Sequence, residues 1–241
     1  MAEGDGHLKT GSVRRLIVGE PIGVFYGYRF DGIFQNEEEC KQQTSSASPI
    51  GVGLRRYKDL NGDGKVDAAN DREILGDANP KFFGGLTNTF AYKGFELNVF
   101  LQYSYGNKIL NYNAMELENP TGGQNAYADM VNRWTPENPS NIYPKATTNR
   151  ALLVSDRFIE DGSYLKLKTL SLSYSFPKIN LKHIQGLRLY VTGQNLLTWT
   201  KYRGYDPEVS YRGASTLEAG EDFGGYPQSR TFMFGIKLDI K

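Results

Sequence analysis

Residues 95–105 read FELNVFLQYSY, and apolar side chains recur there at every second position. Alternate side chains of a β-strand point to opposite faces. The stretch therefore predicts a strand with one apolar and one mostly polar face. The apolar set is Phe95, Leu97, Val99, Leu101, Tyr103 and Tyr105. An apolar face of this kind covers either a protein core or lipid, and the rest of the chain decides between the two.

The preceding stretch, residues 82–92, predicts the partner strand of a β-hairpin. Lys93-Gly94 is the expected two-residue turn, since Gly suits a position with positive φ. A turn of two residues fixes the register, and it continues the apolar face across both strands with Asn88 as the exception. The expected pairs are Tyr92 with Phe95, Phe90 with Leu97, Asn88 with Val99, and Leu86 with Leu101.

Further strands are predicted at 23–34, 164–176, 187–199 and 229–241, mostly by the same alternation. In the second of these, Leu170, Leu172, Tyr174 and Phe176 share one face. Plain alternation places Leu165 and Leu167 on the other face, so the parity changes near Lys168-Thr169. A β-bulge explains this change, and so does a strand that passes from one environment to another.

The predicted connections alternate between short and very long. The short ones are 93–94 and 177–186, and the long ones are 35–80, 106–160 and 202–228, where 127–134 (YADMVNRW) suits a helical turn or two. Short turns on one side and long loops on the other are typical of outer-membrane β-barrels. Aromatic residues also gather at strand ends, as an interfacial girdle requires: Tyr92, Phe95, Tyr174 and Phe176. The favoured class is an antiparallel transmembrane β-barrel, and the alternative is a soluble β-sandwich.

Composition limits the other possibilities. The 28 Lys and Arg nearly balance the 27 Asp and Glu, which argues against a nucleic-acid partner. No stretch approaches the roughly 18 apolar residues of a membrane helix, and the first residues lack the apolar core of a signal peptide. The single cysteine, Cys40, suggests an incidental thiol, and His7 and His183 have no metal-like spacing.

Six segments, in order, resemble the C-terminal part of SusC/RagA-type TonB-linked outer-membrane transporters of Bacteroidetes. The likeness extends from about Gly19 to Leu238, and the segments are GEPIGVFYGYRFDGIFQ, YKDLNGDGKVD, ILGDANPKFFGGLTNTFAYKGFELNVFLQYSYGNKI, DGSYLKLKTLSLSYSFP, LRLYVTGQNLLTWTKYRGYDPE and GYPQSRTFMFGIKL.

The resemblance implies a 22-stranded barrel in the bacterial outer membrane, with an N-terminal plug and a SusD-like lipoprotein lid. It also implies TonB-driven, non-enzymatic import of oligosaccharides or, in some members, peptides. Residues 1–241 are then the C-terminal portion of the barrel, with 35–80, 106–160 and 202–228 as long outer loops. At roughly ten residues a strand plus loops, the chain supplies about a third of such a barrel. An open piece exposes strand edges and a lipid-facing surface, so we expect it to need detergent.

One loop carries a metal-binding pattern. Residues 59–67 (DLNGDGKVD) have oxygens at positions 1, 3 and 5 and Gly at position 6, as in an EF-hand-type calcium loop. Position 12 is Asn70 rather than an acidic residue, and Asp71 follows one residue late. The pattern predicts a structural Ca²⁺ site, and its alternative is a tight Asx/Gly turn. The candidate ligands are Asp59, Asn61, Asp63, Lys65 through its backbone carbonyl, Asp67 and Asp71.

Aromatic side chains in the long connections are candidates for ligand or lid contact, since aromatic faces pack against sugar rings. They are Trp134, Tyr143, Tyr205 and Tyr211, and packing among the loops is the alternative role. The chain shows no catalytic motif, although Asp31, Asp206 and Glu208 are carboxylates that a hydrolase could use. The runner-up function is a soluble, calcium-ordered all-β binding module, possibly carbohydrate-binding.

Overall fold

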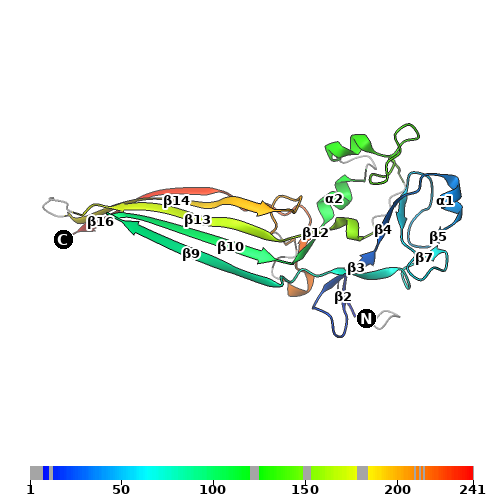
Figure 1. The fold of residues 1–241 in the computed structure, drawn as a ribbon, viewed down its shortest axis with the longest axis horizontal. Coiled ribbons are helices and arrows are strands. Elements are labelled where there is room, and N and C mark those ends of the chain that lie inside the picture. Colours follow the sequence, from blue (N-terminus) through cyan, green and yellow to red (C-terminus); the bar gives the residue numbers. More distant parts are fainter. Residues whose placement is uncertain are drawn as a thin grey trace. The chain divides into compact units, whose positions relative to one another are not determined.

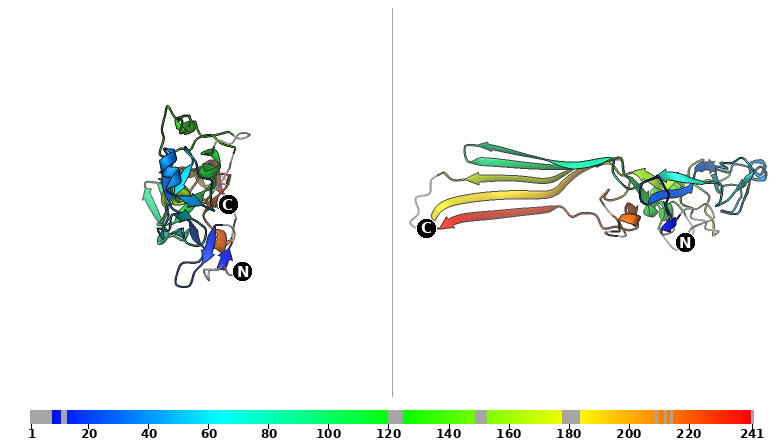
Figure 2. Two further views of the ribbon diagram at one scale, coloured as in Figure 1. Left: turned by 90° about the vertical axis from the view of Figure 1, so that its right-hand side faces the viewer. Right: turned by 90° about the horizontal axis from the view of Figure 1, so that it is seen from below.

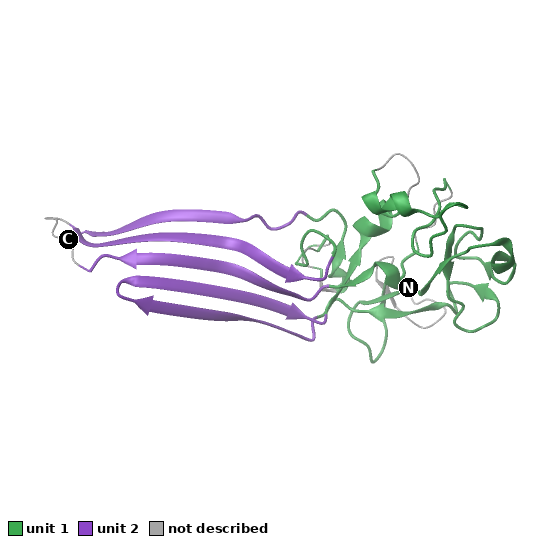
Figure 3. Cartoon of the chain, turned by 45° about the horizontal axis from the view of Figure 1, so that its top comes forward, with its two compact units in different colours: residues 1–79, 107–161, 203–225 green, residues 80–106, 162–202, 226–241 purple. Residues whose placement is uncertain are grey.

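The computed structural model describes residues 8–10, 13–119, 125–148, 153–177, 184–208, 210–211, 213 and 215–240 (Figure 1). The chain divides into two compact units, coloured green and purple in Figure 3. Unit 1 comprises residues 1–79, 107–161 and 203–225, and unit 2 comprises residues 80–106, 162–202 and 226–241. The segments of each unit are therefore interleaved along the sequence.

Unit 2 is a single antiparallel sheet of five long strands in the order β16-β14-β13-β10-β9. The strands lie side by side in the right-hand view of Figure 2. Their bounds are β9 Phe82–Tyr92, β10 Phe95–Tyr105, β13 Tyr164–Ser175, β14 Ile184–Thr200 and β16 Thr231–Ile240. The five strands predicted for this sheet exist, and the ends of three of them are shifted by one to a few residues. The predicted short connection 177–186 includes 178–183, which lie outside the described residues.

The hairpin of β9 and β10 has the predicted register. Tyr92 pairs with Phe95, and the pairing runs without a break to Phe82 and Tyr105. Lys93 and Gly94 have φ of 46° and 90°, as a two-residue turn with two positive φ values requires. Lys93 accepts this conformation because the right-handed twist of the flanking strands favours such a turn.

The parity change in β13 is a β-bulge, as the first of the two explanations predicted. Leu167 pairs with Leu101 and Thr169 pairs with Phe100, so Lys168 is an extra residue. Because of this bulge, Leu165 and Leu167 lie on the same face as Leu170. The expectation from plain alternation that they lie on the opposite face is therefore wrong. On the β14 side, Leu197 pairs with Leu167 and Gln194 with Thr169, so β14 is irregular at the same level.

Unit 1 consists of short strands in four small sheets, ordered β1-β2-β3-β8, β12-β11-β15, β4-β6 and β5-β7. The strands are β1 Leu8–Thr10, β2 Arg14–Leu16, β3 Val24–Tyr28, β4 Phe30–Ile33, β5 Thr44–Ser45, β6 Arg55–Tyr57, β7 Lys65–Val66, β8 Arg72–Gly76, β11 Lys108–Asn111, β12 Ile159–Asp161 and β15 Glu221–Asp222. Its helices are α1 Glu37–Lys41, α2 Tyr112–Leu117, η1 Ala128–Asn132, η2 Asp156–Phe158 and η3 Thr216–Glu218. The helical turn predicted at 127–134 corresponds to η1.

The strand predicted at 23–34 is two strands, β3 and β4, in different sheets. The break has a local cause, because the backbone N–H of Phe30 donates to the carboxylate of Asp156 at 2.8 Å rather than to a neighbouring strand. β3 then pairs with β2 and β8, and β4 pairs with β6. Both strands belong to unit 1 rather than to the long sheet.

Unit 1 has a hydrophobic core in two clusters. The larger contains Val13, Phe25, Leu110, Ala114, Met115 and Phe158, and the smaller contains Tyr28, Tyr57 and Val66. No helix among the described residues is both long enough and apolar enough to cross a membrane.

Candidate functional site

The five-stranded sheet of unit 2 has one continuous apolar face. Cross-strand pairing aligns Phe90, Leu97, Leu172, Val191 and Phe234 in one row. The neighbouring row contains Tyr92, Phe95, Tyr174, Leu189 and Ile236. Alternation along each strand and pairing between strands therefore produce the same surface.

No second layer covers this face among the described residues. Phe234 is 81% exposed and Ile236 is 69% exposed, while Leu97 and Val99 are half-buried. The buried hydrophobic clusters of the described residues lie entirely in unit 1. An apolar face of this extent, left open, is unlike the inner face of a β-sandwich.

Aromatic side chains border the apolar face at both strand ends. Near the 93–94 turn, the Phe95 and Tyr174 ring centroids are 4.5 Å apart, and Tyr174 lies 4.8 Å from Phe176. At the other end, Phe82 stacks on Tyr105 with centroids 4.9 Å apart. Phe95 and Tyr105 are ten residues apart, about 34 Å along the strand. At a tilt of about 40° this spans about 26 Å, close to the apolar band of an outer-membrane barrel.

The opposite face of the same sheet is polar. Arg188 donates to Glu96 at 2.5 Å and to Ser173 at 2.7 Å, which links three strands. Hydroxyl and amide side chains continue this pattern: Ser171 with Thr192, Asn98 with Thr89, and Gln102 with Tyr164. Hydrogen bonds between side chains suit a wet surface rather than hydrocarbon.

The candidate calcium loop, between β6 and β8, is closed by its own backbone. Asp59 accepts N–H groups of Gly62 and Gly64, each at 2.7 Å. Asp71 is fully buried and accepts from Leu60 at 2.8 Å and Asp67 at 2.7 Å. Gly62 and Gly64 have φ of 76° and 81°, which only Gly adopts easily.

The remaining candidate ligands of this loop are also engaged with the backbone. Asn61 accepts from Asp63, Asp63 accepts from Lys65, and Asp67 accepts from Ala69 and Asn70. Among the described residues, no three His, Cys, Asp or Glu side chains are grouped to hold a metal. The hydrogen bonds of this loop are those of Asx turns, the alternative that the sequence also offers. Calcium binding at this loop stays a prediction from the sequence.

The four aromatic candidates fall into two pairs with different surroundings. Trp134 is buried and donates to Gln35 at 3.0 Å, and its backbone N–H donates to the carbonyl of Tyr143. The Tyr143 hydroxyl donates to Asp129 at 3.3 Å. Trp134 and Tyr143 thus pack the loops, whereas Tyr205 is 80% exposed and Tyr211, also exposed, packs edge-on against Phe223.

The carboxylates considered for hydrolysis have structural partners. Asp31 bonds Arg56 at 2.9 Å, and Asp206 accepts the backbone N–H of Glu208 at 3.0 Å. These contacts hold loops and give no sign of an acid–base pair.

A buried arginine–glutamate network joins the long segments of unit 1, and sequence reasoning missed it. The Glu118 carboxylate, 1% exposed, accepts from Arg157 at 2.5 Å and from Arg203 at 2.9 Å. Glu160 also bonds Arg203, at 2.8 Å. Burial by itself lowers the pKa of Arg203, but hydrogen bonds to Glu160 and Glu118 outweigh it and raise the pKa above its usual value.

Two further buried arginines join the N-terminal part of unit 1 to later segments of the chain. Arg14 is buried and its Nε donates to Glu221 at 3.1 Å, across 207 residues of sequence. Arg55 donates to the backbone carbonyl of Glu118 at 3.0 Å. No periodicity or short motif marks these residues, because their spacing in sequence is unrelated to their contacts.

Comparison with known proteins identifies this architecture. No family model matches the chain. TonB-dependent receptor P3 of Formosa agariphila is 39% identical over 239 residues, which are 97% of this chain and 24% of the relative. TonB-dependent receptor SusC of Bacteroides thetaiotaomicron is 28% identical over 192 residues, 76% of this chain and 17% of the relative. The chain thus spans about a quarter or less of the length of these relatives.

Solved structures give the same result. The RagAB peptide importer in its open-open state superimposes with a TM-score of 0.71 at 25% identity, over 96% of this chain and 24% of that chain. These matches define the class, an all-β segment of a TonB-dependent receptor barrel. The resemblance to the SusC/RagA family is confirmed, and this chain is homologous to a segment of those proteins.

Proposed function

We propose that this chain forms wall strands and outer loops of a TonB-dependent importer in the bacterial outer membrane. The observation that carries the proposal is the sheet of unit 2, with its uncovered apolar face, polar reverse face and aromatic borders. In this role the apolar face contacts lipid and the polar face lines the aqueous interior. Energy enters through TonB at another part of the protein, and the chain itself carries out no covalent chemistry.

The proposed cargo is an oligosaccharide or a peptide, received with a SusD-like lipoprotein. The similar SusC and RagAB proteins support this choice, the latter being a peptide importer. The segments 35–80, 106–160 and 202–228 are the proposed outer loops. Most of each segment belongs to unit 1, whose surface carries the exposed rings of Tyr205 and Tyr211 as candidates for lid contact.

Adjacent cysteines on β14 test which face meets lipid. Val191 lies on the apolar face and Thr192 on the polar face. In the complete gene product, with Cys40 replaced by Ser, we expect a water-soluble maleimide to label Thr192→Cys and not Val191→Cys in intact outer membranes. A lipid-soluble maleimide is expected to label Val191→Cys.

Equal labelling of both positions by the water-soluble reagent, in a protein recovered without detergent, would contradict the proposal. That result would favour the soluble binding module instead. The lid contact has a separate test, since Tyr205→Ala with Tyr211→Ala should reduce co-purification of the SusD-like lipoprotein. Tyr143→Phe is the matched control, because Tyr143 packs within the loops.

Cargo class is tested by growth. Deletion of the gene should abolish growth on either oligosaccharides or peptides as the limiting nutrient, and leave growth on the corresponding monomers unchanged. Unchanged growth on both polymers would contradict import of these cargoes by this protein.

A further inference from the structure

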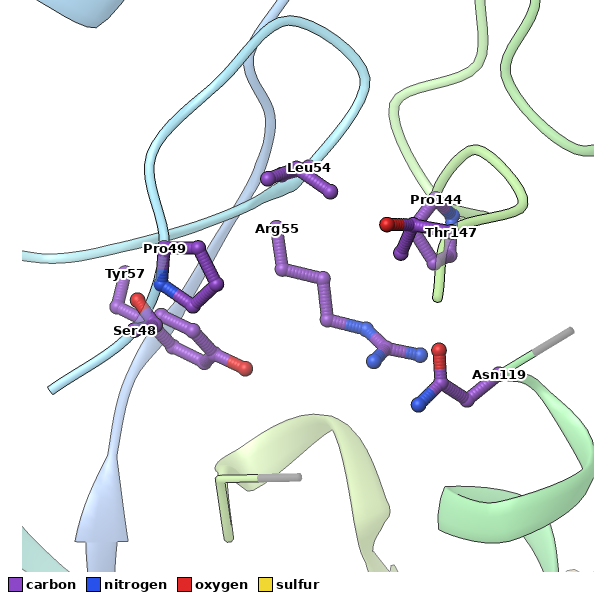
Figure 4. Close-up of a pocket in the computed structure, with 8 residues that line it drawn as sticks. All are labelled: Ser48, Pro49, Leu54, Arg55, Tyr57, Asn119, Pro144 and Thr147. Carbon is purple, nitrogen blue, oxygen red and sulfur yellow. The ribbon is translucent and has the colours of Figure 1, made fainter. Parts of the chain in front are cut away.

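The five-stranded sheet of unit 2 has a hollow of about 610 Å³ at the strand ends away from the 93–94 turn. This volume lies in the range of about 300–1,000 Å³ that is usual for small-molecule sites. The cavity around Arg55 and Asn119 in unit 1, shown in Figure 4, is far smaller, with about 30 Å³ and room for little more than one water molecule. Of these two spaces, only the hollow of unit 2 has room for an organic ligand.

Most of the side chains that border the hollow project from the polar face of the sheet. On β10 they occupy alternate positions, and Phe83 on β9 and Tyr164 on β13 both pair with Ser104 of β10. Phe83 is 76% exposed and the other members of the set are partly exposed, so all of them are accessible. The set is Phe83, Phe100, Gln102, Ser104 and Tyr164.

Phe100 is an aromatic ring in an otherwise polar row. The other β10 residues on this face are Glu96, Asn98, Gln102 and Ser104. An apolar ring that faces water is unfavourable unless another apolar surface packs on it. The position of Phe100 in the hollow therefore indicates a contact surface for a ligand rather than a part of the wet wall.

Gly85 determines how the Phe100 ring lies. A Cβ on Gly85 would be 2.6 Å from Cε2 of Phe100 and 3.0 Å from its Cζ. Strand side chains ordinarily stand away from the sheet, whereas this ring leans across onto β9, where the glycine leaves room for it. A ring in this position has one face against the backbone and presents the other face to the hollow.

Neutral hydrogen-bonding groups lie beside the ring. Gln102 Nε2 donates to the Tyr164 hydroxyl at 3.2 Å, and Ser104 adds a second hydroxyl. Among the described residues, no Asp, Glu, Lys or Arg borders the hollow. Lys166, which pairs with Gln102, is 1% exposed and its ammonium lies 5.7 Å from the Tyr164 ring centroid. An apolar ring face with an amide and hydroxyls around it suits an uncharged sugar ring, and a charged peptide terminus would find no counter-charge there.

We propose that the Phe100 ring, lying on Gly85, is a stacking surface for uncharged sugar rings in the aqueous wall of the importer. Gln102, Ser104 and Tyr164 provide hydrogen bonds to the hydroxyls of the same sugar. The hollow lies at the end of β10 from which the proposed outer loop 106–160 continues, where cargo enters. The inference rests on the proposed function, and of the two proposed cargo classes it selects neutral oligosaccharides.

Calorimetric titration of the complete gene product in detergent, with neutral hexasaccharides of glucose, mannose and xylose, tests the site. We expect at least one of the three to bind. Phe100→Leu keeps an apolar side chain without a ring and should weaken that binding by about tenfold, whereas Phe100→Tyr should retain it. Phe95→Leu is the matched control and should leave the affinity unchanged, since it removes a ring of the same strand from the apolar face.

A second variant tests the position of the ring rather than its presence. Gly85→Ala displaces Phe100 and should also weaken hexasaccharide binding. Gly235→Ala is its control, because a Cβ there would displace Tyr190 on the same face of the sheet but outside the hollow. We expect the affinity of Gly235→Ala to equal that of the unaltered protein.

Three results would overturn the sugar site: no binding of any of the three hexasaccharides, equal affinities for Phe100→Leu and the unaltered protein, or an equal loss in Phe95→Leu. Growth distinguishes this failure from that of the proposed function. If gene deletion abolishes growth on peptides alone, the importer role stands and the sugar site falls. If deletion leaves growth on both polymers unchanged, the proposed function itself is wrong.

Discussion

Tyr57 shows how burial in unit 1 changes the chemistry of a single side chain. Its ring lies against Tyr28, with centroids 5.7 Å apart, and closes the smaller hydrophobic cluster. Burial raises the pKa of Tyr57 to about 12, partly opposed by the nearby Arg55 charge. The unfolded side chain titrates near 10, so the folded state holds the phenol proton more tightly.

A raised folded-state pKa contributes stability that is present below pH 10 and is lost as the pH rises toward 12. We expect the free energy of unfolding of unit 1 to fall by about 2–3 kcal/mol between pH 10 and 12 because of Tyr57 alone. Tyr57→Phe should have a flatter profile between pH 10 and 12, measured by thermal unfolding, with a similar midpoint at pH 8. Parallel profiles for the two proteins would show that Tyr57 does not titrate in this way.

Asp59 is the residue on which the loop 59–71 depends most. Each of its carboxylate oxygens accepts a backbone N–H, from Gly62 and from Gly64. We expect Asp59→Ala to destabilise unit 1 by about 1 kcal/mol, because those donors lose their acceptor.

If the loop is an Asx turn alone, this cost of Asp59→Ala should be the same in EGTA and in millimolar Ca²⁺, measured by thermal unfolding. A cost that appears only with Ca²⁺ would show that the loop binds the ion, as its sequence pattern predicts. In EGTA, Asn61→Ala should cost less than Asp59→Ala, since its side chain exchanges hydrogen bonds with Asp63 alone, at 3.2 and 3.0 Å.

Strands of unit 2 present different chemistry at neighbouring positions. On β16, Phe234 lies on the apolar face opposite Val191, and Met233 lies on the polar face opposite Thr192. If the apolar face contacts lipid, a charge there must enter hydrocarbon, whereas a charge on the reverse face meets water.

Phe234→Arg is therefore expected to destabilise the membrane-inserted barrel by about 2–4 kcal/mol. Met233→Arg, one residue away, should cost far less. Heat-modified mobility of the folded barrel on gels, followed over a temperature series, measures both variants. Equal loss of stability in the two would mean that the faces are not distinguished by lipid and water.

Elements of this sheet were largely predictable because each rests on local rules. Alternation fixed the faces of β10, and the Lys93-Gly94 turn fixed the register of the hairpin. The parity change at Lys168-Thr169 located the bulge. Unit 1 was not predictable in this way. Its strands are short, and contacts such as Arg14 with Glu221 join residues far apart in sequence.

At the scale of the whole molecule, the five-stranded sheet of unit 2 is open. β9 and β16 each have one neighbour among the described strands, so each presents an unpaired edge. Unpaired edges and an uncovered apolar face are both routes to aggregation.

The 241-residue chain produced alone is therefore expected to aggregate without detergent. Size-exclusion chromatography with and without a mild detergent measures this. A monomeric, folded chain in plain buffer would contradict both the open edges and the lipid-facing role of the sheet.

The arginine–glutamate network of unit 1 has a consequence for how such proteins diversify. Glu118, Arg203 and Arg55 come from three separate segments, and the buried Glu118 carboxylate accepts from Arg203 while its backbone carbonyl accepts from Arg55. In a chimera that takes one of these segments from a distant relative, a buried charge loses its partner. Recombination should therefore preserve a working receptor only when all three segments are inherited together, so that new specificities arise by replacing the set rather than a single loop.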